Sequence, residues 1–385
     1  MYPSYKINPD WSRLAKQIVK SNQTVIVIGT TDSGKSTFCR YLIDFAYTAG
    51  LKVGFVDTDV GQSQIGPPTT IGMKIYEPNE TETHEKTITD TQNASQTTDL
   101  EKSKRFETQE KPGEEQSHHF IDIPDSLYFV GDTSPHRNLL YVLSGTQLMV
   151  EAAHKRDADF VVLDTSGYLH VSLGWQLKQQ KIELIRPQHI VCIGRKTEFQ
   201  QIVGYNDNFN HLNIHYLLPH KETKTKNRTE RIDNRNKKFA RYFNDATIQQ
   251  VSFDQIRSVR TLFFNGRIAK EKEIQMLTDL ADIEIDYAEW GDRSLNIITR
   301  TILSTVTTKK IKDYLSLLHL NNQKPDFLNN LLVGMLDEQG NTIGIGVITS
   351  IDFKNHVFNI RCKHGHTDKA TVFQFSNYHY TEIEK

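Results

Sequence analysis

A short loop near the start of the chain carries residue types that bind phosphate groups. Residues 29–37 fit the pattern G-x-x-x-x-G-K-[ST]. Glycines allow a tight turn in which successive N–H groups point at phosphate oxygens, Lys35 supplies charge to the β and γ oxygens, and Ser36 can ligate Mg²⁺. The pattern predicts binding of a nucleoside triphosphate by nine residues: Gly29, Thr30, Thr31, Asp32, Ser33, Gly34, Lys35, Ser36 and Thr37.

The neighbouring segments favour this interpretation over a simple glycine-containing turn between a strand and a helix. Residues 24–28 are an apolar run typical of a buried strand, and residues 38–48 have helical periodicity. A phosphate-binding loop needs this order, because the helix that follows points its free N–H groups at the anion. No Asn-Lys-x-Asp motif, which would recognise guanine, follows a late strand, so ATP is the expected nucleotide.

A second acidic stretch follows the apolar run 53–56 and contains Asp57, Asp59 and Gln62. Ligands of open α/β sheets bind outside the carboxyl ends of the strands, so both carboxylates are expected near the γ-phosphate. Asp59 could hold Mg²⁺ through water or accept a proton from an attacking hydroxyl. Asp57 could share this role or could cap the turn that follows it.

A third strand, predicted at residues 160–163, ends in Asp164. Proteins with a phosphate-binding loop place their Mg²⁺-organising aspartate at such a strand end. The expected metal ligands are therefore Ser36, Asp59 and Asp164.

The most basic part of the chain is the segment 221–241, which has nine Lys or Arg residues and three Asp or Glu residues. Such a run can be an ordinary charged surface helix. After the last strand of a phosphate-binding sheet, it can also act as a lid that brings arginines onto the transferring phosphate, or it can clamp a polynucleotide backbone. The candidate side chains are Arg228, Arg231 and Arg235.

Composition excludes other classes of protein. A net charge of -1 over 385 residues excludes a uniformly basic coat for nucleic acid, so contact with a polyanion needs a local patch. The three cysteines match no metal or redox spacing, and no apolar run is long enough to span a membrane. We expect a soluble, cytoplasmic protein with reduced cysteines.

Short β-rich runs alternate with helical patterns after residue 24, which predicts an α/β fold with a mostly parallel sheet flanked by helices. The expected strands are 24–28, 53–57, 126–131, 160–164 and 189–194, and the expected helices are 36–49, 138–155 and 174–185. A further helix is expected to begin near Trp11. Residues 78–119 have hardly any apolar side chains and are predicted to be a disordered insertion.

The pattern restarts after residue 257, which predicts two domains. Residues 1–257 form a kinase-type domain with a basic lid at 221–243, and residues 258–385 form a smaller mixed α/β domain rich in β-structure. Its expected strands are 261–264, 294–299, 332–340, 342–349, 353–359 and 371–375, with helices at 270–280 and near 309–318. Gly344 and Gly346 are interpreted as packing or bulge glycines.

Together these stretches resemble the polynucleotide 5'-hydroxyl kinase family, and the compact archaeal-type members most closely. The resemblance spans most of the chain outside the insertion. Asp59-Val-Gly-Gln62 is similar to the family's D-x-G-Q motif, Asp164-Thr-Ser-Gly167 to its D-T-x-G motif, and residues 231–243 to its lid. The resemblance implies that Asp59 activates the substrate hydroxyl, that Gln62 assists in positioning, and that Lys35, Arg231 and Arg235 act on the transferring phosphate.

One stretch departs from the family pattern. Residues 133–138 lie where the family has a clasp with Pro and Gly that grips the terminal nucleotide, but no glycine follows Pro135 here. His and Arg lack glycine's backbone freedom, so the grip on substrate is expected to differ. The expected substrate contacts are Thr133, Ser134, Pro135, Arg137 and Asn138, together with Arg228 of the lid.

The sequence thus favours Mg²⁺-assisted transfer of the ATP γ-phosphate to a 5'-hydroxyl end of RNA or DNA. Two alternatives stay open: an ATPase or ligase of related architecture that acts on a small molecule, and a non-catalytic ATP-binding scaffold for RNA processing.

Overall fold

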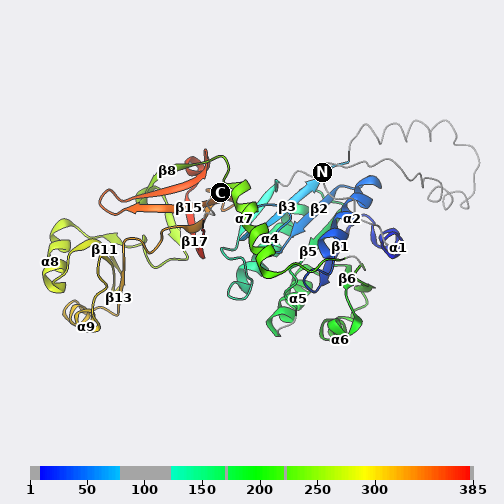
Figure 1. The fold of residues 1–385 in the computed structure, drawn as a ribbon, viewed down its shortest axis with the longest axis horizontal. Helices are drawn as coiled ribbons and strands as arrows, with labels where there is room; N and C mark the ends of the chain where they lie inside the picture. The colour runs from blue at the N-terminus through cyan, green and yellow to red at the C-terminus, as the bar shows by residue number, and fades with distance from the viewer. Residues whose placement is uncertain (1–8, 79–122, 170–171, 221–222, 382–385) are drawn as a thin grey trace, which may run out of the picture.

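The computed structural model describes residues 9–78, 123–169, 172–220 and 223–381 (Figure 1). Apart from residue 78, the predicted insertion lies outside these residues, as do the first two residues of the predicted lid. No helix in the described ranges is long and apolar enough to cross a membrane.

Five parallel strands form the half of the molecule that contains the phosphate loop. Their order is β7-β6-β1-β5-β2. They comprise β1 Gln23–Gly29, β2 Val53–Asp57, β5 Phe160–Asp164, β6 His189–Ile193 and β7 Asn213–Leu217. Four of the five were predicted within one residue at each end. β7 was missed because Asn213 and His215 interrupt its short apolar pattern.

Helices cover both faces of this sheet. On one face lie α1 Pro9–Ile18 and α2 Lys35–Thr48, whose Trp11, Leu14 and Phe38 share a core with alternate residues of β1. The second core packs α4 Leu139–His154, α5 Ser172–Ile185 and α6 Gln200–Asn206 against the opposite face. Lys196–Phe199 forms a short 3₁₀ helix before α6. Because both faces are covered, the strands are almost continuously apolar.

Two antiparallel strands extend the sheet beyond β2. They are β3 Thr70–Tyr76 and β4 Ser126–Phe129. β4 ends two residues before the end of the strand predicted at 126–131. β3 was not predicted. Gly72 and Lys74 interrupt the apolar run of β3, which hides it in the sequence.

The C-terminal part adds a mainly antiparallel set of strands, linked to the first set by one pair, Thr342 with Leu127. These strands are β8 Ala246–Ser252, β9 Arg257–Val259, β14 Leu331–Leu336, β15 Thr342–Asp352, β16 Val357–Lys363 and β17 Val372–His379. Phe253–Gln255 is a short 3₁₀ helix and His366–Lys369 forms α10. Gly344 and Gly346 lie inside β15, where an added Cβ would be 2.3 Å from His366 and 2.7 Å from Ile360, so they are packing glycines as predicted.

A separate four-stranded sheet forms the end of the molecule farthest from the phosphate loop (Figure 1). It contains β10 Arg267–Ile268, β11 Ile285–Gly291, β12 Ser294–Thr299 and β13 His319–Gln323, with α8 Glu271–Ala281 and α9 Thr305–Tyr314. The strand predicted at 261–264 is wrong. These residues form bends, because Phe264 adopts a φ of 69° and donates its N–H to Glu289 instead of a neighbouring strand.

The predicted lid contains one helix, α7 Arg228–Tyr242, which lies between the two parts of the molecule (Figure 1). Its last turn is anchored by Phe239 and Phe243, which share a core with Phe129 of β4, Leu332 of β14 and Tyr380. Strand β8 lies before residue 258 in the chain but pairs with β16 of the C-terminal part. The division of the chain into domains at residue 258 stays a prediction.

Candidate active site at the carboxyl edge of the parallel sheet

The predicted phosphate loop connects β1 to α2 and has the backbone that its sequence requires. Gly34 has a φ of 92°, which residues with a side chain rarely adopt, and Asp32 has a φ of 58°. At Gly29 an added Cβ would lie 2.5 Å from Ser33 Oγ and 2.6 Å from the carbonyl oxygen of Ile193. Both glycines are therefore needed for this conformation.

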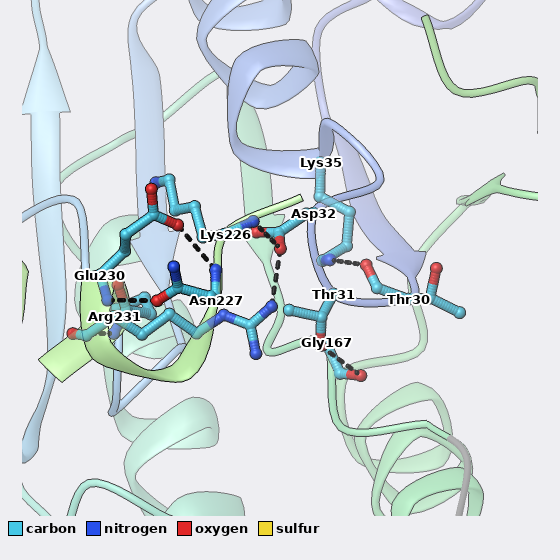
Figure 2. Close-up of polar contacts among 10 residues, drawn as sticks. Thr30, Thr31, Asp32, Lys35, Gly167, Lys226, Asn227, Glu230 and Arg231 are labelled. Carbon is cyan, nitrogen blue, oxygen red and sulfur yellow. Dashed lines mark hydrogen bonds and ion pairs between the residues drawn. The ribbon is translucent and has the colours of Figure 1, made fainter. Parts of the chain in front are cut away.

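Lys35 lies within the loop that it is expected to serve. Its side chain is 6% exposed, and its Nζ donates a hydrogen bond of 2.7 Å to the carbonyl oxygen of Thr30 (Figure 2). The ammonium group is thus held next to the backbone that would surround a phosphate.

The Asp164-Thr-Ser-Gly167 segment packs directly against this loop. Thr31 Oγ1 donates to the carbonyl oxygen of Gly167 at 3.4 Å (Figure 2). A Cβ at Gly167 would lie 2.4–2.6 Å from atoms of Thr31, so only glycine permits this approach. The two motifs recognised in the sequence therefore meet in space.

Two acidic strand ends lie side by side, because Asp57 of β2 pairs in register with Asp164 of β5. Both side chains are buried, at 0% and 1% exposure. Burial raises the pKa of both carboxyl groups, and with the negative charge of Asp164 nearby the pKa of Asp57 rises to about 7. The charge of Lys35 and a hydrogen bond from Ser36 act in the opposite direction on Asp164.

The role of Asp57, left open by the sequence, is the capping of a turn. Its carboxylate accepts hydrogen bonds from the N–H of Asp59 at 3.0 Å, from the N–H of Gln64 and from Ser63 Oγ at 3.2 Å. It is not among the residues that line the adjoining cavity.

Asp59 does line that cavity. Its Oδ1 accepts the N–H groups of Gly61 and Gln62, both at 3.0 Å, which fixes the carboxylate at the start of the turn.

The predicted lid contacts the phosphate loop through Asp32. Its Oδ2 accepts a hydrogen bond from the backbone N–H of Lys226 at 2.9 Å and forms an ion pair of 2.7 Å with Arg231 Nη2 (Figure 2). Asn227 and Glu230 form a reciprocal capping box, which explains why α7 begins at this point.

The lid also contacts the loop that carries Asp59. Gln62 Nε2 donates to the carbonyl oxygen of Arg231 at 3.1 Å, and Lys238 Nζ donates to the carbonyl oxygens of Gln62, at 3.2 Å, and Ser63. Gln62 thus connects the acidic turn to the lid.

A cavity of about 820 Å³ lies between these elements. The phosphate loop forms one wall. α7 forms another with Arg231, Asn234, Lys238 and Arg241, which recur every three or four residues along one helix face. Sequence reasoning missed Asn234, Lys238 and Arg241, although this spacing is visible in the sequence. Trp11, Ile193 and Leu218 supply apolar surface to the cavity.

The remaining lid candidates lie elsewhere. Arg228 is exposed and does not line the cavity. Arg235 does not line it either. It lies near Tyr378 of β17. Burial raises the pKa of this tyrosine hydroxyl, the charge of Arg235 acts to lower it, and the charge of Asp132 acts to raise it.

The predicted clasp forms a loop next to the acidic turn, outside the cavity. A Cβ at Gly61 would lie 2.7 Å from the carbonyl oxygen of Thr133, so the two loops are in contact. Ser134 and Arg137 are exposed, whereas Pro135 and Asn138 are buried. The Asn138 side chain donates to Asp132 Oδ2 at 3.3 Å, so its amide links two side chains of the same loop.

Several buried polar atoms in the elements around the cavity lack hydrogen-bond partners among the described residues. They are Ser33 Oγ, Asp164 Oδ1, Arg231 Nε and, beside the clasp, Arg235 Nε. Unpartnered buried groups are rare in proteins, and this set has the donors and the carboxylate that a phosphate chain and its cation require. No group of three or more His, Cys, Asp or Glu suitable for a metal occurs within the described ranges. A divalent cation here would need oxygen ligands from the nucleotide as well, which is typical of Mg²⁺.

Two residues that sequence reasoning missed lie beneath the site. Lys178 and Lys181 of α5 are both 0% exposed. Burial lowers the pKa of both ammonium groups, to about 7 for Lys181, while the negative charges of Asp57, Asp59 and Asp164 act against this at Lys181. Two lysines three residues apart on an otherwise apolar helix face were the available signal.

Fold and site define a protein with a phosphate-binding loop of the phosphotransferase type. The model of the family described as mRNA cleavage and polyadenylation factor CLP1 P-loop matches residues 29–98 and 107–245, more than half of the chain. The chain belongs to this family.

Archaeal relatives align over nearly the whole length. A polyribonucleotide 5'-hydroxyl-kinase of Methanocaldococcus jannaschii is 29% identical over 87% of this chain and 80% of the relative. A polyribonucleotide 5'-hydroxyl-kinase of Pyrococcus furiosus is 28% identical over 91% of this chain and 86% of the relative. One chain of a solved Clp1p–Pcf11p complex has a similar structure over 96% of this chain and 79% of its own length. The TM-score is 0.58 and the sequence identity is 12%, so this match shows a shared fold.

Proposed function

We propose that this protein transfers the γ-phosphate of ATP to the 5'-hydroxyl end of RNA or DNA. The observation that carries the proposal is the shared cavity edge, where the phosphate loop, Asp59 and the basic face of α7 meet. The polyribonucleotide 5'-hydroxyl-kinases that match most of the chain support the same reaction. The proposal includes a cytoplasmic location, which the three free cysteines support because thiols persist in reducing compartments.

The donor half of the site is the phosphate loop with its neighbours. The loop N–H groups and Lys35 would bind the β- and γ-phosphates, together with Arg231, which reaches the loop from α7 and pairs with Asp32. Ser36 and Asp164 fit Mg²⁺, because the Oδ1 atom of Asp164 is buried without a partner. When bound, Mg²⁺ neutralises charge on the β and γ oxygens.

The acceptor half is the turn that begins at Asp59. We propose that this carboxylate orients the 5'-hydroxyl and takes its proton as the new O–P bond forms and the bond between the β-γ bridging oxygen and the γ-phosphorus breaks, which releases ADP. The contact of Gln62 with Arg231 would coordinate lid and acceptor loop.

The clasp contacts the same turn, because Thr133 lies against Gly61, and Arg235 and Asp132, the residue before the clasp, both lie near Tyr378. Arg137 of the clasp is exposed and could pair with a substrate phosphate. The buried Asn138 and Pro135 would shape the loop, and Thr133 and Ser134 would contact the terminal nucleotide through their backbone and hydroxyl groups.

The test is transfer of label from γ-labelled ATP by wild-type protein to three oligonucleotides of one sequence: RNA with a 5'-hydroxyl, DNA with a 5'-hydroxyl, and RNA already phosphorylated at its 5' end. We expect label on at least one 5'-hydroxyl end and none on the blocked control. ATP hydrolysis without labelled oligonucleotide would contradict the proposal in favour of a small-molecule enzyme. ATP binding without any turnover would contradict it in favour of a scaffold.

A further inference from the structure

Helix α5 places two lysines beneath the acidic edge of the sheet, in a position that normally holds apolar side chains. Lys178 and Lys181 are 0% exposed, although Leu177 and Ile182 beside them belong to the apolar core. Removing an ammonium group from water is unfavourable unless specific interactions compensate for it. A merely structural helix face would carry leucine or methionine here.

Each lysine binds one of the two segments that carry the site's carboxylates. Lys181 Nζ donates to Thr58 Oγ1 at 2.7 Å, and Thr58 lies between Asp57 and Asp59. Lys178 Nζ donates to the carbonyl oxygen of Ser166 at 2.7 Å and to its Oγ at 3.3 Å, two residues after Asp164. The two ammonium groups therefore reach adjacent strand ends from below.

Thr58 joins these two segments. Its Oγ1 donates to the carbonyl oxygen of Asp164 at 2.8 Å and its N–H donates to the same oxygen at 3.0 Å. Lys181, Thr58 and Asp164 thus form a continuous chain of hydrogen bonds across β2 and β5. A shift of the lysine would move the backbone at Asp59.

The charges in this region balance without a direct ion pair. Asp57, Asp59 and Asp164 act electrostatically on Lys181, and Lys35 and Lys181 act on Lys178. Among the described residues neither lysine is within 4.0 Å of a carboxylate oxygen. The lysines therefore use none of the aspartate oxygens, and each holds a segment that carries an aspartate.

We propose that Lys181 and Lys178 are positioning residues of the phosphotransferase site, Lys181 through Thr58 for Asp59 and Lys178 through Ser166 for Asp164. This inference rests on the proposed kinase function. Neither lysine touches the reacting atoms. Lys181 sets the position of the Asp59 carboxylate, and Lys178 sets the position of the Asp164 carboxylate.

The experiment compares Lys181→Met and Lys181→Arg with wild type in steady-state phosphorylation of a 5'-hydroxyl oligonucleotide. Lys155→Met, which changes an exposed lysine in the same part of the chain, is the matched control. We expect Lys181→Met to lower kcat by about 100-fold, the effect of a misplaced catalytic group, with an unchanged KM for ATP. Lys181→Arg should recover part of the rate. Equal kcat values for Lys181→Met and Lys155→Met would overturn the inference.

Two further variants separate positioning from folding. Thr58→Val keeps the lysine but removes the hydroxyl that accepts its hydrogen bond, and it should reproduce the fall in kcat. In an Asp59→Asn background, Lys181→Met should have little further effect, because the group it positions is already gone. Independent, additive losses would contradict a role through Asp59. Absence of transfer by wild-type protein would overturn the kinase function itself, whereas wild-type transfer with an unaffected Lys181→Met would overturn only the positioning role.

Discussion

Two buried carboxylates, one in each sheet, show how differently this fold treats a charge removed from water. Glu289 of β11 is 0% exposed, and donors of the protein itself surround its oxygens. These donors are the N–H groups of Phe264 and Gly266, the hydroxyl of Tyr287 and the side-chain amide of Asn296. Asp164 of β5 is equally buried, yet its Oδ1 has no hydrogen-bond partner within the part of the chain that the structure describes.

The same contrast holds for two arginines. Arg260 donates to the carbonyl oxygens of Phe129 and Val130 and lies 3.7 Å over the ring of Tyr141. Arg231 pairs with Asp32 through one terminal nitrogen, while its Nε is buried without a partner. Buried polar groups are normally satisfied within a protein. Where they are not, as at Asp164 beside the phosphate loop and at Arg231 on the cavity wall, a ligand is the expected partner.

The largest effect is expected from Arg231→Ala. An arginine on the transferring phosphate contributes about 1000-fold or more to kcat. Arg228→Ala, which removes an exposed arginine three residues earlier on the same helix, is the matched control and should retain nearly full kcat. Steady-state kinetics with both variants test this difference, and similar kcat values would remove Arg231 from the site.

Asp164→Asn is expected to come next. Loss of the carboxylate should lower kcat by about 100-fold or more, because the charge that organises the phosphates is gone. Glu289→Gln should leave kcat unchanged. Measuring both rates across a range of Mg²⁺ concentrations adds a second comparison, since only Asp164→Asn should raise the Mg²⁺ concentration needed for half-maximal rate.

The free energy of unfolding should be lowered by Glu289→Gln and not by Asp164→Asn, the reverse of the expected effects on kcat. Glu289→Gln disturbs a carboxylate that accepts several hydrogen bonds, so the free energy of unfolding in urea should fall by about 1–3 kcal/mol. Asp164→Asn should not destabilise, because it removes an incompletely compensated buried charge. A destabilised Asp164→Asn beside an unaffected Glu289→Gln would reverse the comparison between the two acids.

The smallest effect concerns the edge of the parallel sheet opposite the site. Burial lowers the pKa of His189 to about 4, and its Nδ1 lies 3.1 Å from His215 Nε2. The pKa of histidine in the unfolded chain is about 6.5. The contribution of neutral His189 to the free energy of unfolding is therefore fully present above pH 6.5 and is lost as the pH falls toward 4. Unfolding of His189→Gln in urea should therefore depend less on pH in this range than unfolding of wild type. Parallel curves would show that His189 does not contribute.

The sequence predicts the phosphate-binding half of the fold well because local signals agree there. The loop glycines and Lys35 directly follow one apolar run, and Asp57 and Asp164 each directly follow another. The parallel register then follows from topology, and it places Asp57 beside Asp164.

The rest depends on contacts that strand and helix patterns do not reveal. Whether Asp57 caps a turn or faces the cavity is decided by Ser63 and Gln64, which a strand-end pattern does not reveal. The partner of Arg231 is Asp32, 199 residues away. The two lysines of α5 cannot be recognised as functional until the sheet edge above them is known.

In the proposed reaction, Asp59 acts on a 5'-hydroxyl acceptor while the phosphate loop binds ATP. The most direct measurement is the single-turnover transfer of label from γ-labelled ATP to a 5'-hydroxyl RNA oligonucleotide by wild type and Asp59→Asn, with the ATP affinity of both proteins measured in parallel. We predict unchanged ATP affinity and transfer that is about 100-fold or more slower in Asp59→Asn. Equal transfer rates, or no transfer by wild-type protein that binds ATP, would contradict the account.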